Sequence, residues 1–329
     1  MSLALKEAWK YQVLTCPNPA VGAVVVSACG KILSIAAHQK AGRPHAEVIA
    51  LQEAYAQLTG DNFILELHDS AEIHNYLLKH HNGCFRGCDL YTTLEPCAHV
   101  GKTPACATLI SSLQLADVFV GATDTNEEAQ GGNTLLRSCG VAVHEGILEK
   151  ECNELLLPFR KYLEGGFVFF KWASRLDGST HGGTISSLES RKFVHQMRDV
   201  CDLIVIGGNT VRTDRPRLDA RLVKGKAPDV LIYSRSKEFD QTIPLFNVPD
   251  RKVIVSASLE QIQNYRCVMI EGSEALFMQT TAYTDMYLSF IVPKFAKSDG
   301  FRNVEAEFEI LSEQKVGDDI MAWMILKDS

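Results

Sequence analysis

The first half of the chain alternates short apolar runs with longer amphipathic stretches. Residues 20–26 form a continuous apolar run rich in β-branched side chains, which is typical of a strand covered on both faces. Residues 45–58 lack Gly and Pro and are rich in Ala, Leu, Glu and Gln, which favours a helix. Further strands are predicted at 32–37, 90–94, 118–121 and 141–143, and a second helix at 107–115. This βαβαβ order with a leading hairpin predicts an α/β domain on a mixed sheet.

A long connection interrupts this alternation. About thirty residues separate the helix at 45–58 from the strand at 90–94, which is more than most connections need. Residues 73–80 can form a short helix inside it. The segment also carries His80, His81, Cys84 and Cys88. These side chains could bind a second metal, but a surface loop with incidental His and reduced Cys is the favoured interpretation.

The second half repeats the α/β style after a charged segment that ends at Pro158. We place the boundary near residue 150, so that the domains are 1–150 and 151–329. An apolar run opens at 167–170, and further strands are predicted at 203–206, 230–233, 253–255, 268–270, 287–292, 308–311 and 321–326. Gly, Asp and Asp at 317–319 predict a hairpin turn between the last two strands. No G-x-G-x-x-G follows a strand, so a Rossmann dinucleotide site is not indicated.

Composition and charge narrow the class of protein. The 329 residues hold 33 Lys and Arg against 40 Asp and Glu, a formal charge of −7 that argues against broad binding of nucleic acid. No apolar stretch is long enough to span a bilayer, and the first residues show no secretory signal. Ten cysteines are too few for a disulfide scaffold in a chain of this length. We expect a soluble, cytoplasmic protein with reduced cysteines and no membrane partner.

One group of residues has the chemistry of a zinc site. His45, Cys97 and Cys106 provide the imidazole and thiolate ligands that Zn²⁺ prefers, in the number that a catalytic site uses. Bound zinc brings the pKa of a coordinated water close to neutral. Glu47 lies two residues after the ligand His and can act as the proton shuttle of a deaminase. A closed structural site is the alternative, and it needs a fourth protein ligand, for which His99 is the nearest candidate.

Three long motifs at 17–22, 38–47 and 93–106 closely resemble the deaminase half of the RibD family of bifunctional riboflavin-biosynthesis proteins. The resemblance implies a cytidine-deaminase-like, three-layer α/β/α domain. It also implies that the eight residues between Cys97 and Cys106 help to form the substrate pocket. By the same resemblance the pocket residues are Asn18, His38, His99 and Lys102.

Shorter pieces of the second half resemble the reductase half of the same family, an α/β domain similar to dihydrofolate reductase. They lie at 171–180, 185–187, 198, 207–218 and 271–273. The resemblance implies NADPH as cofactor, bound by Ala173, Thr184, Thr210, Asp214, Ser234 and Ser273. It places Arg198, Leu218, Arg221 and Glu271 at the substrate.

The family resemblance implies two reactions on a phosphorylated pyrimidine, in a homodimer or homotetramer. The first is hydrolysis of the 2-amino group of 2,5-diamino-6-ribosylamino-4(3H)-pyrimidinone 5′-phosphate. The second is reduction of the ribosyl group to a ribityl chain by NADPH. The second half departs from the family at several positions: Thr184 replaces a Trp, Asp219 replaces a Thr, and the Gly-rich turn is reduced to residues 272–274. An active deaminase with a degenerate reductase half is therefore one alternative. A zinc deaminase acting on a nucleic-acid base, which the charge of −7 disfavours, and a non-catalytic interaction protein stapled by zinc are the others.

Overall fold

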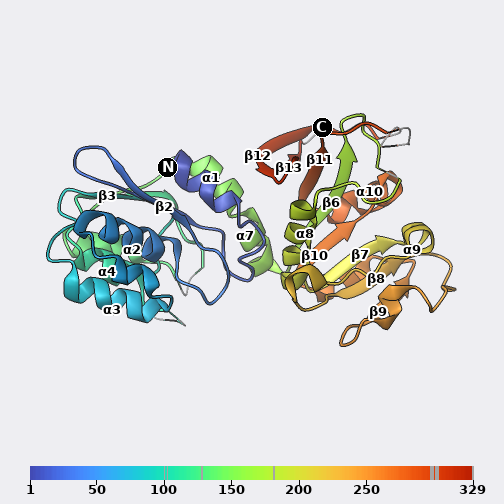
Figure 1. Cartoon of the computed structure of the whole chain (residues 1–329), viewed down its shortest axis with the longest axis horizontal. Coiled ribbons are helices and arrows are strands. Elements are labelled where there is room, and N and C mark those ends of the chain that lie inside the picture. The colour runs from blue at the N-terminus through green and yellow to red at the C-terminus, as the bar shows by residue number, and fades with distance from the viewer. Residues whose placement is uncertain are drawn as a thin grey trace. The chain divides into compact units, whose positions relative to one another are not determined.

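The chain folds into two compact units. The computed structural model describes residues 1–99, 101, 103–126, 129–180, 182–296, 300 and 304–327. The units are Met1–Arg160 and Lys161–Ser329, and Figure 1 colours the first from blue to green and the second from green to red. The division falls ten residues beyond the position near 150 that the sequence suggested. Helix α6 (Glu149–Leu155) accounts for the difference, because it contacts α1 and β4 and buries Cys152 in the first unit.

The first unit is built on a five-stranded sheet with the order β2-β1-β3-β4-β5. The strands are β1 (Gly22–Val26), β2 (Ile32–Ala37), β3 (Asp89–Leu94), β4 (Asp117–Ala122) and β5 (Ala142–His144). β1 pairs antiparallel with β2 and β3, whereas β3, β4 and β5 run parallel. These four pairings confirm the five strands predicted for the first half and the hairpin that opens them.

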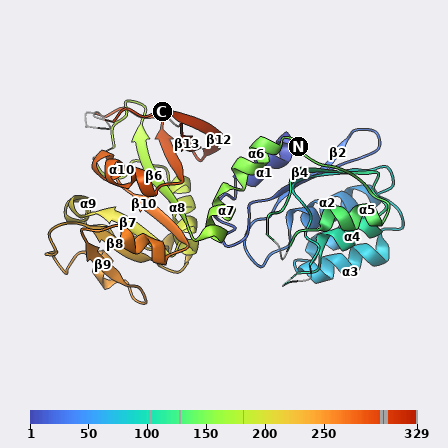
Figure 2. The same ribbon diagram turned by 180° about the vertical axis from the view of Figure 1, so that it is seen from behind.

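Helices cover both faces of this sheet. They are α1 (Ser2–Trp9), α2 (Ala46–Thr59), α3 (Ser70–His80), α4 (Cys106–Ser112), α5 (Gly132–Ser138) and α6, with a 3₁₀ turn η1 (Asn62–Glu66) before α3. Figures 1 and 2 show α1 and α6 on one side of the sheet and α2 to α5 on the other. This confirms the predicted three-layer domain. The long connection contains the predicted short helix, now α3, which packs on α2.

The second unit is built on an eight-stranded sheet with the order β12-β13-β11-β6-β10-β7-β8-β9. The strands are β6 (Phe167–Arg175), β7 (Leu203–Gly207), β8 (Asp229–Tyr233), β9 (Val253–Ser256), β10 (Cys267–Glu271), β11 (Met286–Val292), β12 (Phe308–Val316) and β13 (Asp319–Leu326). The six strands from β11 to β9 in that order run parallel, and β13 and β12 add an antiparallel hairpin. Gly317 forms the predicted turn with φ +60°, in the left-handed region that favours glycine.

Short helices connect the strands of the second unit. They are α7 (Leu157–Glu164), which crosses the boundary, α8 (Leu188–Val200), α9 (Gly208–Asp214) and α10 (Glu274–Thr280), with 3₁₀ turns η2 (Arg221–Val223), η3 (Pro244–Asn247), η4 (Glu260–Asn264) and η5 (Thr281–Tyr283). Because β6, β10 and β7 are parallel neighbours, their carboxyl ends meet at one edge of the sheet. Among the described residues, no helix has the length and apolar character to cross a bilayer.

Candidate active sites

Three ligand-type side chains meet in the first unit. His45 immediately precedes α2, Cys97 follows β3, and Cys106 is the first residue of α4. The Nδ1 atom of His45 lies 3.7 Å from Sγ of Cys97 and 3.3 Å from Sγ of Cys106. One donor atom from each residue fits within 4.8 Å of the other two. Positions up to 61 residues apart in the sequence therefore form one cluster.

The donor set of this cluster suits zinc. Imidazole nitrogen and thiolate sulfur are the ligands that Zn²⁺ takes most readily. A hydrogen bond with Cys106, and to a smaller extent one with His45, lowers the pKa of the Cys97 thiol below its usual value. The thiolate form is therefore favoured. His99 is not part of the cluster. Within the described part of the chain this is the single group of three such donors, so nothing there supports a second metal at residues 80–88.

Glu47 lies beside the cluster on the first turn of α2. Its side chain is buried, with 4% of the residue exposed, and it lines the same cavity as His45 and Cys97. Burial raises the pKa of Glu47 to about 7. A carboxyl group that can hold or release a proton near neutral pH is what a proton shuttle requires.

A cavity of about 370 Å³ opens onto the cluster, and the predicted pocket residues Asn18, His38 and His99 line it. Lys102 lies outside the described residues. Nδ1 of His38 donates to the carbonyl of Pro44 at 3.0 Å, so Nε2 is left to accept from the amide of Asn18 at 3.1 Å. Burial lowers the pKa of His38 to about 4, which keeps the ring neutral. The carbonyl oxygen of Asn18 then remains as an acceptor.

Glu95 is a residue of this site that sequence reasoning did not single out. It is buried and lies two residues before Cys97 in the chain. Its carboxylate accepts hydrogen bonds from the backbone N–H groups of Asp124 at 3.2 Å and of Gly131 and Asn133 at 3.0 Å each. The segment held in this way contributes Asp124 to the cavity wall. The sequence did contain one indication of this role, because Glu95 is an acidic residue between the end of a buried strand and the Pro-Cys pair at 96–97.

A second cavity, of about 470 Å³, lies at the carboxyl edge of the parallel strands in the second unit. Nine of the ten predicted cofactor and substrate residues line it: Ala173, Thr184, Arg198, Thr210, Asp214, Leu218, Arg221, Glu271 and Ser273. Ser234 is not among the lining residues. It packs against Gly208, where an added Cβ would lie 2.7 Å from Cβ of Ser234. Gly208 therefore permits a close approach of α9 to the end of β8.

Two of the predicted substrate residues bind each other. Arg198 on α8 presents Nε and Nη2 to both carboxylate oxygens of Glu271 at 2.8–3.0 Å. The two side chains are only 12% and 14% exposed. Lys171 lies 4.0 Å from the same carboxylate. Although burial opposes ionisation, Arg198 and Lys171 lower the pKa of Glu271, so the pair is charged.

Comparisons with known families agree with this division. Residues 1–122 match the "Cytidine and deoxycytidylate deaminase zinc-binding region", and residues 166–320 match the "RibD C-terminal domain". The "Riboflavin biosynthesis protein RibD" of Aquifex aeolicus is 36% identical over 269 residues, which cover 79% of this chain and 68% of the relative. The Synechocystis protein of the same name is 34% identical over 249 residues, which cover 73% of this chain and 60% of the relative.

Solved structures extend the match to the whole chain. RibD from Acinetobacter baumannii superposes with a TM-score of 0.64 at 25% identity, covering 99% of this chain and 98% of the other. A diaminohydroxyphosphoribosylaminopyrimidine deaminase/5-amino-6-(5-phosphoribosylamino)uracil reductase from Thermotoga maritima gives 0.63 at 26% identity, covering 99% and 97%.

The first unit is thus a zinc-binding domain of the cytidine deaminase class, and it is followed by a reductase-type α/β domain, as the sequence predicted. The chain belongs to the RibD family of bifunctional riboflavin-biosynthesis enzymes.

Proposed function

We propose that the first unit removes the 2-amino group of a diaminopyrimidinone ribosyl phosphate by hydrolysis. His45, Cys97 and Cys106 would hold the zinc ion, which supplies a nucleophilic water at neutral pH. Glu47 would take a proton from that water as the oxygen adds to the ring carbon. It would then deliver the proton to the amino group, so that the carbon–nitrogen bond breaks and ammonia leaves. Asn18, His38 and His99 would orient the ring, together with Lys102.

We assign the second reaction, reduction of the ribosyl group by NADPH, to the second unit. The protein's task there is to place the nicotinamide against C1′ of the sugar, and Ala173, Thr184 and Thr210 would border the cofactor. Asp214 and Ser273 would complete this wall, with Ser234 at its edge. The shared cavity supports the assignment because it gathers predicted cofactor residues and predicted substrate residues at one sheet edge.

One observation carries the deaminase assignment: three zinc-type donors within 4.8 Å of one another beside a buried carboxyl in a cavity. The test uses the purified zinc-loaded chain and the diaminopyrimidinone substrate. Release of ammonia, followed by loss of NADPH absorbance when cofactor is added, supports both activities. Ammonia release without NADPH oxidation would instead indicate a degenerate reductase half. Zinc binding with neither activity would favour a non-catalytic interaction protein.

A cytoplasmic location and a homo-oligomeric state are further parts of the proposal. All ten cysteines are free thiols, which fits a reducing compartment. Oligomeric state is tested by light scattering of the purified chain, where a monomer mass would contradict the expected dimer or tetramer.

A further inference from the structure

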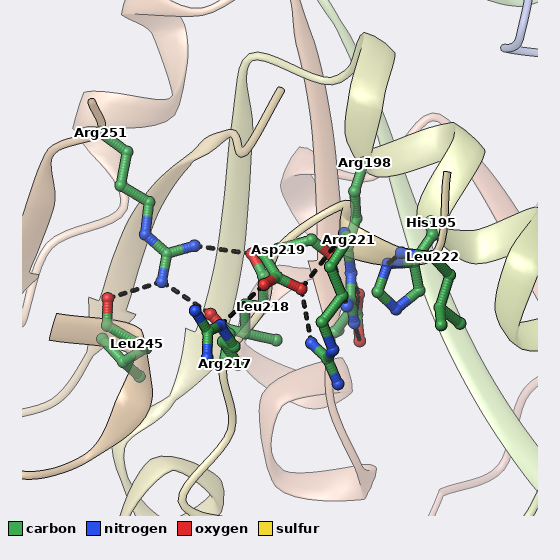
Figure 3. A network of polar contacts seen from close by, with 10 residues as sticks. His195, Arg198, Arg217, Leu218, Asp219, Arg221, Leu222, Leu245 and Arg251 are labelled. Atoms are coloured by element: carbon green, nitrogen blue, oxygen red, sulfur yellow. Dashed lines mark hydrogen bonds and ion pairs between the residues drawn. The ribbon is translucent and has the colours of Figure 1, made fainter. Parts of the chain in front are cut away.

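Two arginines of the second cavity share one carboxylate. Arg217 and Arg221 both line the cavity, and their side chains are 52% and 56% exposed. Asp219, only 10% exposed, lies between them. Oδ2 of Asp219 lies 2.8 Å from Nε of Arg217, and Oδ1 accepts from Nη1 of Arg221 (Figure 3). The carboxylate therefore holds both guanidinium groups at the rim of one cavity.

The backbone that carries this trio is itself fixed. Arg251 donates from Nη1 to the carbonyl of Leu218 at 2.6 Å and from Nη2 to the carbonyl of Arg217 at 2.7 Å. From the opposite side, Nη1 of Arg198 donates to the carbonyl of Asp219 at 3.3 Å (Figure 3). These bonds hold Leu218 in a left-handed conformation with φ +54°, which is unfavourable for a branched residue without such support.

The arginine pair keeps donors that Asp219 does not use. Each guanidinium has five N–H donors. Asp219 contacts Nε of Arg217 and Nη1 of Arg221. Among the described residues, this leaves both Nη groups of Arg217 and the Nη2 group of Arg221 without a partner. Arg198 differs, because its Nε and Nη2 edge is taken by Glu271. Arginine forks suit the oxygens of a phosphate group, and two forks with one carboxylate retain a net positive charge.

We infer that Asp219 is a positioning residue that holds Arg217 and Arg221 as a two-arginine clamp for the phosphate of the substrate in the second cavity. The inference rests on the proposed reductase function and adds Arg217 and Asp219 to its binding site. A side chain that is held in place loses less conformational entropy when it binds a ligand than a free one does. If Asp219 positions the arginines, removing its charge should weaken phosphate binding. If it only competes with phosphate for the arginines, removing its charge should tighten phosphate binding.

The test uses the full chain carrying Asp219→Asn, which removes the charge and turns one acceptor into a donor facing a guanidinium. We expect KM for the phosphorylated substrate to rise about tenfold, as for the loss of one charged hydrogen bond. KM for the dephosphorylated riboside and the rate of ammonia release should stay unchanged. Asp240→Asn is the matched control, because Asp240 also accepts from an arginine, Arg215, at 2.7 Å but does not line the cavity. It should leave both KM values unchanged.

A binding measurement separates this inference from the proposed activity. Trp172 lines the cavity, so its fluorescence can report titration with ribose 5-phosphate and with ribose without any turnover. Arg217→Lys and Arg221→Lys change exposed side chains and cover the case in which Asp219→Asn does not fold. Each should weaken ribose 5-phosphate binding and leave ribose binding unchanged.

Three results would overturn the clamp. One is equal binding of ribose 5-phosphate and ribose by the wild type. The second is phosphate binding that Asp219→Asn leaves unchanged or tightens, and the third is phosphate binding that both lysine variants leave unchanged. A wild type that binds ribose 5-phosphate through these residues but does not oxidise NADPH would retain the clamp and remove the reductase assignment.

Discussion

Each predicted zinc ligand reaches the cluster from a different part of the first unit. His45 comes from the start of α2, Cys97 from the loop after β3, and Cys106 from the start of α4. Since every ligand supplies one donor atom, none can substitute for another. Zinc affinity therefore depends on all three side chains.

Replacing a single ligand should release the metal. Loss of a residue that only hydrogen-bonds a metal ligand typically lowers metal affinity about 10–100-fold. Because Cys97→Ala removes a ligand itself, we expect it to lower zinc affinity by more than this. Metal content after dialysis against a chelator measures this. Cys139→Ala is the matched control, because Cys139 is exposed and lies outside the cluster. Full zinc content in Cys97→Ala would show that the ion binds elsewhere.

Single residues also mark the limit of what the sequence predicts. The clustering of His45, Cys97 and Cys106 was predictable, because zinc chemistry restricts such sites to a few residue types. The Arg198–Glu271 pair was not, since 73 residues separate its members and only the packing of α8 beside β10 brings them together. Each had been assigned to the substrate alone.

At the scale of elements, α8 and β10 are joined by that ion pair. Glu271→Gln leaves the largely buried cations of Arg198 and Lys171 without the carboxylate that balances their charge. We expect the free energy of unfolding to fall by about 3 kcal/mol, measured by urea denaturation. Glu307→Gln is the control, because the Lys327–Glu307 pair is exposed and should contribute less than about 1 kcal/mol. Equal effects of the two variants would contradict a structural role for the buried pair.

We expect His195, also on α8, to make the stability of the second unit depend on pH. Its Nδ1 accepts from the backbone N–H of Leu222, and burial lowers its pKa from 6.5 to about 4. Between these values the unfolded chain binds the extra proton, so stability should decrease as the pH falls from about 6.5 to about 4. Urea midpoints at neutral and mildly acidic pH measure the slope, and His195→Gln should reduce it. An identical slope in the variant would exclude His195 as the cause.

Regular elements were easier to predict than short or irregular ones. The apolar run at 20–26 became β1, because a strand buried on both faces needs continuous apolar sequence. Helix α5 was missed because it is only seven residues long and begins at a glycine. That glycine, Gly132, is needed for packing, since a Cβ there would overlap the carbonyl of Pro96. Helix α1 is also short and was not predicted.

At the scale of the whole molecule, the two units imply two thermal unfolding transitions. Removing zinc should lower the midpoint of the first unit alone, by about 2–4 °C for each kcal/mol of lost binding free energy. Calorimetry before and after chelation measures this shift. A shift of both transitions by the same amount would contradict independent folding of Met1–Arg160 and Lys161–Ser329.

The proton-shuttle role of Glu47 in a zinc-dependent deamination is measured most directly by the effect of Glu47→Gln on zinc content and ammonia release together. The amide keeps the shape of the side chain but cannot shuttle a proton. We therefore predict full zinc content with ammonia release reduced about 10²–10⁴-fold. Ammonia release at the wild-type rate from a zinc-loaded Glu47→Gln chain would show that Glu47 is not the proton shuttle.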